Sequence, residues 1–228
     1  PFFGAEVLKG LAEYQKPCLV ITSFDKPVGR KKEITPPLAK KTALDLQIPV
    51  FQTESNSEVL AKLEEIKPDL LISASCGQIL SKEILSTPRL GCLNVHPSLL
   101  PKYRGCSPIQ SAILKGDEKT GVTIFLMSEG IDQGKIIAQG ETSISSKDDY
   151  LSLEKKLARL GSDLLMKTLP KWIKGDIKPR EQSGESSYAP KITKQDGRID
   201  WSEGANQIER KVRAFRPWPG AFTFWQRG

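Results

Sequence analysis

Apolar positions in the first 115 residues follow two alternating spacings. Short apolar runs at residues 18–23, 69–75 and 89–95 (CLVITS, DLLISAS and RLGCLNV) are typical of buried strands. Between them, apolar residues recur at helical spacing in AEVLKGLAEY, PLAKKTALDLQ and EVLAKLEEIK, which predicts amphipathic helices. Strands that alternate with helices favour an α/β fold with an open, mostly parallel, twisted sheet.

The pattern changes after this region. Residues 107–117 predict a helix that is capped by Ser107, has Pro108 at its first position and ends near Gly116. Residues 121–144 then predict two strands joined by a glycine-rich turn. A long amphipathic helix follows, with a capping box in SKDD from Ser146 and apolar positions as far as Trp172.

The remaining sequence indicates a linker and a second unit. Residues 176–194 contain turn-forming residues and little apolar periodicity, so we expect a linker between a first unit at 1–175 and a second at 195–228. In the second unit, Ser202 is a candidate helix cap, and Ile208, Val212 and Phe215 would form one apolar face.

Charge adds a candidate contact surface. The chain has a formal net charge of +7, which permits a polyanionic partner without requiring one. Prolines and a glycine in residues 25–41 predict a loop with no regular element. Both a solvated surface loop and a phosphate-contacting loop fit this composition. The basic residues of this loop are Lys26, Arg30, Lys31, Lys32, Lys40 and Lys41.

Composition also argues against some classes of protein. No apolar run approaches the roughly 18 residues of a membrane span, and no secretory signal can be read in the sequence given, which begins at Pro1. The four cysteines are irregularly spaced and the chain has one histidine, so a zinc site is not expected. Reduced, buried thiols in a cytoplasmic protein are the simpler interpretation.

The first candidate for chemistry is that single histidine, His96, which follows Asn94 at the end of a predicted strand. Open α/β sheets place ligands at the carboxyl ends of their strands. We therefore expect Asn94 to face the site and His96 to turn into the following loop. A lone histidine is often structural, and this alternative stays open on position alone.

Asp132 supplies a carboxylate between Gly130 and Gly134, in a turn that could reach the same sheet edge. A turn-forming aspartate is the alternative. An amide, an imidazole and a carboxylate together suit acyl transfer to an amine, because the first two stabilise an oxyanion and the third assists proton removal. No serine or cysteine with a partner base is evident, which favours direct transfer without a covalent intermediate.

These residues carry a resemblance to a known family. LNVHPSLLPKYRG, followed 36 positions after His96 by Asp132 in GIDQG, resembles the folate-dependent formyltransferases. PVGRKK, TGVTIFLM, YAPKITKQDGRIDWS and RAFRPWPGAF extend the resemblance over nearly the whole chain. It implies a Rossmann-like catalytic domain at 1–175 and the start of an OB-like β-barrel domain that binds tRNA at 195–228. Because family members have a strand before the position of Pro1, we expect a fragment that lacks this strand and most of the barrel.

The resemblance also implies the reaction. The donor would be 10-formyltetrahydrofolate, and the acceptor would be the amino group of methionine on initiator tRNA, in a cytoplasmic monomer without a metal. Asn94 and His96 would polarise the formyl oxygen, and Asp132 would pair with His96 and assist proton removal. The residues implied in folate binding are Cys76, Gly77, Gln78, Ile79, Leu80, Glu129, Gly130 and Ile131. Those implied in tRNA binding are Arg30, Lys26, Lys31 and Lys32.

Three alternatives remain. A related enzyme could formylate a small amine, such as glycinamide ribotide or an amino sugar nucleotide, but it would not explain the basic loop. A folate-binding hydrolase would release formate without an amine acceptor. A non-catalytic nucleic-acid-binding module would leave Asn94, His96 and Asp132 without a role.

Overall fold

A computed structural model describes residues 1–29 and 31–225, so Arg30, predicted to contact tRNA, lies outside the described residues. The helices are α1 (Phe2–Tyr14), α2 (Leu38–Asp45), α3 (Asn56–Ile66), α4 (Lys82–Ser86), α5 (Pro108–Lys115), α6 (Tyr150–Lys174), α7 (Ala205–Ala214) and the 3-10 helix Gln195–Gly197. The strands are β1 (Val20–Thr22), β2 (Lys26–Val28), β3 (Glu33–Thr35), β4 (Val50–Gln52), β5 (Leu71–Ala74), β6 (Cys92–His96), β7 (Arg104–Gly105), β8 (Lys119–Leu126), β9 (Ile136–Ser143) and β10 (Tyr188–Ala189).

The predicted α/β class is confirmed, but the mostly parallel central sheet is not. The largest sheet has the order β5-β6-β8-β9, in which β5 and β6 are parallel and the other two pairs are antiparallel. The two antiparallel pairs arise from the hairpin predicted at 121–144. Its strands, β8 and β9, join the sheet directly instead of forming a separate ribbon. β1 and β4 form a separate parallel pair.

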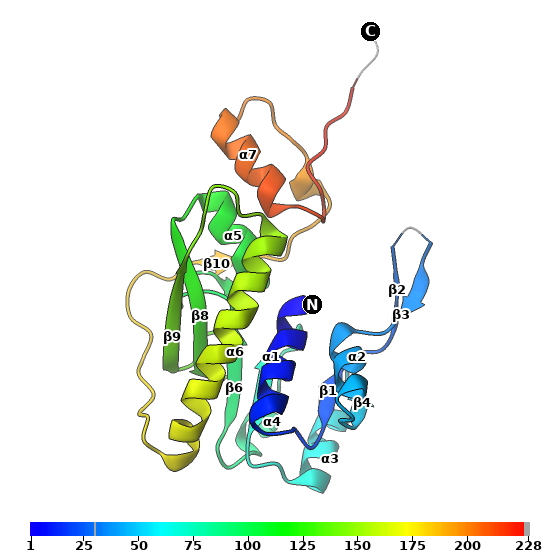
Figure 1. Cartoon of the computed structure of the whole chain (residues 1–228), viewed down its shortest axis with the longest axis vertical. Helices are drawn as coiled ribbons and strands as arrows, with labels where there is room; N and C mark the ends of the chain where they lie inside the picture. Colours follow the sequence, from blue (N-terminus) through cyan, green and yellow to red (C-terminus); the bar gives the residue numbers. More distant parts are fainter. Residues whose placement is uncertain (30, 226–228) are drawn as a thin grey trace.

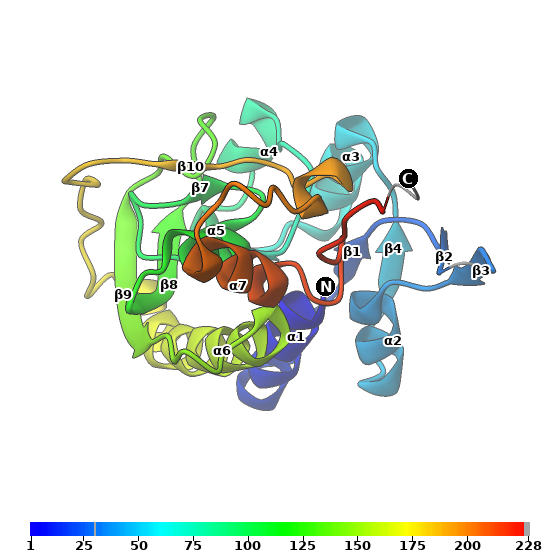
Figure 2. The same cartoon turned by 90° about the horizontal axis from the view of Figure 1, so that it is seen from above.

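Two helices cover one face of the four-stranded sheet (Figures 1 and 2). α1 packs against α6, and α6 packs against β6, β8 and β9. The core between them buries Phe3 of α1, Val95 of β6 and Leu157 of α6. At Gly161 of α6, an added Cβ would lie 3.1 Å from Val95 Cγ1 and 3.3 Å from Phe3 Cζ, so a glycine allows this close approach. This packing fixes which face of β6 remains free for chemistry.

The basic segment forms a regular element, contrary to the sequence-based expectation. β2 and β3 pair as an antiparallel hairpin in which Pro27 lies opposite Ile34. A two-stranded hairpin tolerates this proline, because a strand with a free edge needs only part of its N–H groups for pairing. The hairpin projects away from the main body of the protein (Figure 1).

The predicted helix caps are partly wrong. α6 begins after Asp149, whose carboxylate accepts from the N–H of Ser152 at 2.9 Å, so the capping box lies three residues beyond Ser146. Ser202 does not cap α7, because its side chain donates to Asp200 and the cap position is Gly204. Val212 is 47% exposed, so the predicted apolar face of α7 holds only in part.

The expectation that the thiols are buried is wrong for three of the four cysteines. Cys18, Cys76 and Cys106 are exposed, whereas Cys92 on β6 is buried. Burial raises the pKa of the Cys92 thiol to about 11. Among the described residues, no helix is both long and apolar enough to cross a membrane.

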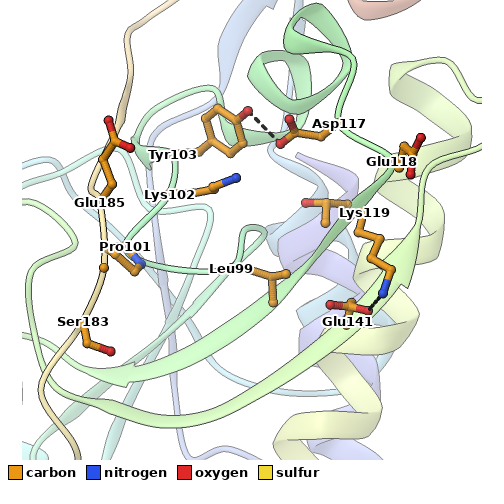
Figure 3. A pocket seen from close by; sticks show the side chains of 12 residues that line it. Leu99, Pro101, Lys102, Tyr103, Asp117, Glu118, Lys119, Glu141, Ser183 and Glu185 are labelled. Carbon is orange, nitrogen blue, oxygen red and sulfur yellow. Dashed lines mark hydrogen bonds and ion pairs between the residues drawn. The ribbon is translucent and has the colours of Figure 1, made fainter.

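A cavity of about 580 Å³ lies between the loop after β6, the start of β8 and the segment around Ser183 (Figure 3). Its lining includes Lys102, Tyr103, Asp117 and Glu185. It includes none of the three predicted catalytic residues.

Candidate active site

Asn94 and His96 both lie on β6, where they alternate with Leu93 and Val95. Leu93 and Val95 are buried in the core under α1 and α6. Because successive side chains of a strand point to opposite faces, Asn94 and His96 share the other face of the sheet. The prediction that His96 turns into the loop is therefore wrong, because β6 continues through His96 in register with Thr123 of β8.

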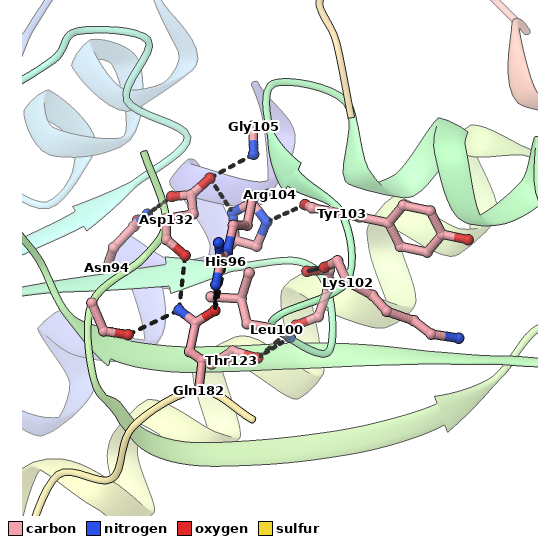
Figure 4. Close-up of polar contacts among 12 residues, drawn as sticks. Asn94, His96, Leu100, Lys102, Tyr103, Arg104, Gly105, Thr123, Asp132 and Gln182 are labelled. Atoms are coloured by element: carbon pink, nitrogen blue, oxygen red, sulfur yellow. Dashed lines mark hydrogen bonds and ion pairs between the residues drawn. The ribbon is translucent and has the colours of Figure 1, made fainter. Parts of the chain in front are cut away.

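The structure brings Asp132 to the same place (Figure 4). Its carboxylate accepts from the backbone N–H of Gly105 at 2.7 Å and from Asn94 Nδ2 at 3.5 Å. His96 Nδ1 lies 3.6 Å from Asp132 Oδ2. Thus the three residues chosen from the sequence form one cluster, although Asp132 comes from the β8–β9 loop.

Asp132 has a backbone φ of +49°, in the left-handed region, which is unfavourable for residues other than glycine although aspartate tolerates it better than most. This conformation is stable only where neighbouring groups hold it. The Gly105 N–H on the side chain is one such group. The direction of the carboxylate is therefore set by the backbone conformation of the β8–β9 loop and by the Gly105 N–H, since Asp132 itself lies in no helix or strand.

His96 is fixed at its other nitrogen. Nε2 lies 2.9 Å from the carbonyl oxygen of Tyr103, so Nε2 carries a proton and donates it. In neutral His96 the unprotonated nitrogen is therefore Nδ1, which faces Asp132. Burial lowers the pKa of His96, while the Asp132 carboxylate and the Tyr103 carbonyl oppose this shift. The site thus holds one imidazole nitrogen that gains and loses a proton.

A network of hydrogen bonds orders the loop that carries Tyr103. The hydroxyl of Thr123 on β8 donates to the Ser98 carbonyl at 2.7 Å and accepts from the Leu100 N–H at 3.0 Å. Tyr103 is buried, and its hydroxyl donates to Asp117 at 2.8 Å. Burial and the Asp117 carboxylate raise the pKa of Tyr103 above its usual range. These contacts fix the carbonyl that orients His96.

The residues expected to bind folate follow β5 and precede Asp132. Cys76, Gly77 and Ile79 are exposed after the carboxyl end of β5, as are Glu129 and Ile131 in the β8–β9 loop, while Gly130 is half-buried. The side chains of Gln78 and Leu80, in contrast, make contacts within the protein itself.

Gln78 donates to the Asn56 side chain at 2.7 Å and to the Glu54 carbonyl at 3.3 Å. Leu80 is 9% exposed and packs in a core cluster with Val59 and Ile84. Its side chain is therefore committed to the core, so only its backbone is left for a ligand.

A second cavity, of about 370 Å³, adjoins the cluster. Its lining includes Arg104, Ile131, Gln133 and Tyr188. Arg104 precedes Gly105 and Ile131 precedes Asp132, the two residues joined by a hydrogen bond in the cluster. This smaller cavity, and not the larger one of Figure 3, is the one next to Asp132.

The basic hairpin stands apart from the cluster. Lys31 and Lys32 are exposed in the turn, and Lys26 pairs with Glu54 at 2.5 Å. Within residues 1–29 and 31–225, no three His, Cys, Asp or Glu side chains gather in a way that could hold a metal ion.

Sequence reasoning missed three groups at the site: the Tyr103 carbonyl, the Gly105 N–H and the side chain of Gln182. The first two are backbone groups, which have no residue-type signal. Gln182 lies in the segment interpreted as a linker. No pattern around it indicates a contact with a loop 50 residues earlier.

An α/β sheet with an amide, an imidazole and a carboxylate on its free face fits a group transferase, and comparison with known families identifies its class. The family model described as "Formyl transferase" matches residues 4–169. The model described as "Formyl transferase, C-terminal domain" matches residues 191–228. The chain belongs to the formyl transferase family.

Its relatives include named proteins and solved structures. It is 43% identical over 227 residues to the methionyl-tRNA formyltransferase of Thermodesulfovibrio yellowstonii, covering 98% of this chain and 74% of that protein. It is 44% identical over 231 residues to the same-named protein of Enterococcus faecalis, covering 99% of this chain and 74% of that protein.

Two solved structures share the fold. HypX from Aquifex aeolicus in complex with tetrahydrofolic acid has a TM-score of 0.71 at 23% identity, over 90% of this chain and 35% of that chain. WlaRD, a sugar 3N-formyl transferase crystallised with dTDP and 5-N-formyl-THF, has a TM-score of 0.71 at 25% identity, over 93% of this chain and 75% of that chain. The Rossmann-like α/β fold of formyltransferases is thereby established for this chain.

Proposed function

We propose that this chain transfers a formyl group from 10-formyltetrahydrofolate to the amino group of methionine on initiator tRNA, for translation initiation. The observation that carries the proposal is the 43% and 44% identity, across 98% and 99% of the chain, to two proteins named methionyl-tRNA formyltransferase. The cluster of Asn94, His96 and Asp132 supports it, because its groups suit acyl transfer to an amine.

The reaction begins with attack of the amine nitrogen on the formyl carbon. A C–N bond forms, and the carbonyl electron pair moves to the oxygen. Asn94 donates one N–H to Asp132 and has a second N–H for this oxyanion. His96 adds a second donor when Nδ1 is protonated, since Nε2 is engaged by Tyr103.

Collapse of the tetrahedral intermediate breaks the bond between the formyl carbon and N10 of the folate. The electron pair goes to N10, and the proton lost by the amine ends there. Asp132 accepts a proton from the amine or stabilises protonated His96, which lies 3.6 Å away. The products are the formylated amine and tetrahydrofolate, and no metal is required by this route.

The other predicted residues complete the proposal. The folate lies along residues 76–80 and 129–131, through side chains such as Ile79 and Ile131 and the backbone at Leu80. The tRNA contacts the β2–β3 hairpin through Arg30, Lys26, Lys31 and Lys32. Residues 1–175 form the catalytic domain, and 195–228 begin a tRNA-binding domain of OB-like barrel type. The protein acts as a cytoplasmic monomer.

A label-transfer experiment tests the function. The protein is incubated with 10-formyltetrahydrofolate labelled in the formyl group and with charged initiator tRNA, glycinamide ribotide, an amino sugar nucleotide or water alone. We expect label on the tRNA only. Label on a small amine would replace the proposed acceptor, labelled formate without an acceptor would indicate a hydrolase, and tRNA binding without turnover would indicate a binding module.

A further inference from the structure

The segment of residues 179–189, which we call the strap, is bonded to both parts of the active site. Arg180 exchanges two backbone hydrogen bonds with Ile136 at the start of β9, at 2.7 and 2.9 Å. Ser187 accepts from the N–H of Tyr103 through its hydroxyl, and from the N–H of Arg104 through its carbonyl, each at 2.9 Å. The strap therefore spans the β8–β9 loop and the loop after β6.

Between these two attachments, the Gln182 side chain lies under the Asp132 loop (Figure 4). Its Nε2 donates to the carbonyl oxygens of Asp132 at 2.8 Å and Gly134 at 2.9 Å. Its Oε1 accepts from Arg104 Nε at 3.1 Å and Nη2 at 2.7 Å. Both N–H groups and the oxygen of this amide are thus used, which leaves it one orientation.

We infer that Gln182 is a positioning residue that holds the backbone of Asp132 so that its carboxylate lies against Asn94 and His96. The inference rests on the proposed function for its catalytic consequence. Its structural basis is independent, because Asp132 has the unfavourable φ of +49° and needs surrounding groups to keep it. Gly105 fixes the Asp132 side chain, and Gln182 fixes its main chain.

Three variants separate positioning from a general effect on folding. Gln182→Ala removes all four contacts. Gln182→Glu keeps the length and the acceptor for Arg104 but has no N–H for the two carbonyls. Ser183→Ala, at the exposed next position of the strap, is the matched control. If the alanine variant unfolds, Gln182→Met keeps the length without an N–H and replaces it.

In steady-state formylation of charged initiator tRNA, we expect kcat to fall about 10²-fold for Gln182→Ala and Gln182→Glu, because misplacing a reacting group by about 1 Å costs that much. KM for both substrates should change less than about threefold, because no substrate contact is removed. Ser183→Ala should match the parent. A loss confined to KM, or a Gln182→Glu variant with parental kcat, would overturn the inference.

An NMR titration tests the same point without turnover. His96 is the only histidine, so one imidazole signal reports its ionisation. Asp132 raises the pKa of His96, so the pKa should fall in the Gln182→Ala protein as the carboxylate moves away. An unchanged titration would contradict the inference. If the parent formylates no tRNA, the proposed function fails, while this titration still decides whether Gln182 positions Asp132.

Discussion

Replacement of Gly134 by alanine should displace the Asp132 loop without altering any catalytic side chain. An alanine Cβ at this position would overlap the carbonyl oxygen of Leu126 and lie 2.9 Å from its carbonyl carbon. Leu126 is held in β8, in register with Leu93 of β6, so the loop must move and the strand stays in place. The φ of Gly134 is not in the left-handed region, so the overlap is the main effect.

The size of the movement follows from contact distances. Carbon atoms in contact lie about 3.5–4.0 Å apart, so the 2.9 Å approach to the Leu126 carbon requires a retreat of at least about 0.6–1.1 Å, and the closer overlap with the Leu126 oxygen requires more. The carbonyl of Gly134 also accepts from Gln182, and Asp132 lies two residues earlier. A displacement of about 1 Å at a reacting group lowers the rate about 10²-fold. The strain should cost about 1–3 kcal/mol of unfolding free energy.

Two measurements on Gly134→Ala check this reasoning: kcat for formylation of charged initiator tRNA, and the denaturant midpoint with its slope. The control is Gly204→Ala at the cap of α7, where an added Cβ would have its nearest neighbour at 3.9 Å. We expect the control to retain the parental kcat. A Gly134→Ala protein with kcat within threefold of the parent would refute the link between this loop and catalysis.

Four further predictions follow from the site and the core. Asn94→Ala should lower kcat about 10²- to 10³-fold, since it removes an oxyanion donor, and near-normal turnover of a folded variant would reject that role. Asp132→Asn should lower the pKa of His96, measured by NMR, because the carboxylate raises it; a rise would reverse the assigned electrostatics. Lys32→Ala should reduce the salt dependence of tRNA binding by about one phosphate contact, and an identical slope would exclude such a contact. Leu157→Ala, at a fully buried position of α6, should lower the unfolding free energy by about 2–5 kcal/mol in denaturant titrations, whereas a loss below 1 kcal/mol would mean that the core closes around the cavity.

The strands and helices could be predicted where apolar spacing is local. The run at 89–95 and the two strands within 121–144 have clear patterns, and the structure has β6, β8 and β9 there. The short turn predicts that β8 and β9 are antiparallel, and they are. The direction of β8 relative to β6 was not predictable from apolar spacing, because an apolar strand has the same pattern whether its neighbour is parallel or antiparallel. For that reason the mostly parallel sheet was the wrong expectation.

The candidate site shows the same division. Asn94, His96 and Asp132 are residue types with recognisable chemistry, and the structure brings them together as expected. The face on which they lie depends on the core that α1 and α6 form with Leu93 and Val95 of β6, which joins residues far apart in sequence. Gln182 could not be found, because its partners are backbone carbonyls and a guanidinium that impose no pattern on the sequence.

The fixed orientation of His96 has a consequence for how the proposed reaction depends on pH. Its Nε2 is committed to the Tyr103 carbonyl, so only Nδ1 can donate to the oxyanion, and it does so only when protonated. Burial lowers the pKa of His96. Below that pKa Nδ1 carries a proton and is a donor, and above it Nδ1 is an acceptor that faces Asp132. Above the pKa, Asn94 is left as the side-chain donor of the cluster. The rate lost in Asn94→Ala should therefore grow as the pH rises through the pKa of His96, and an equal loss at every pH would show that His96 does not donate to the oxyanion.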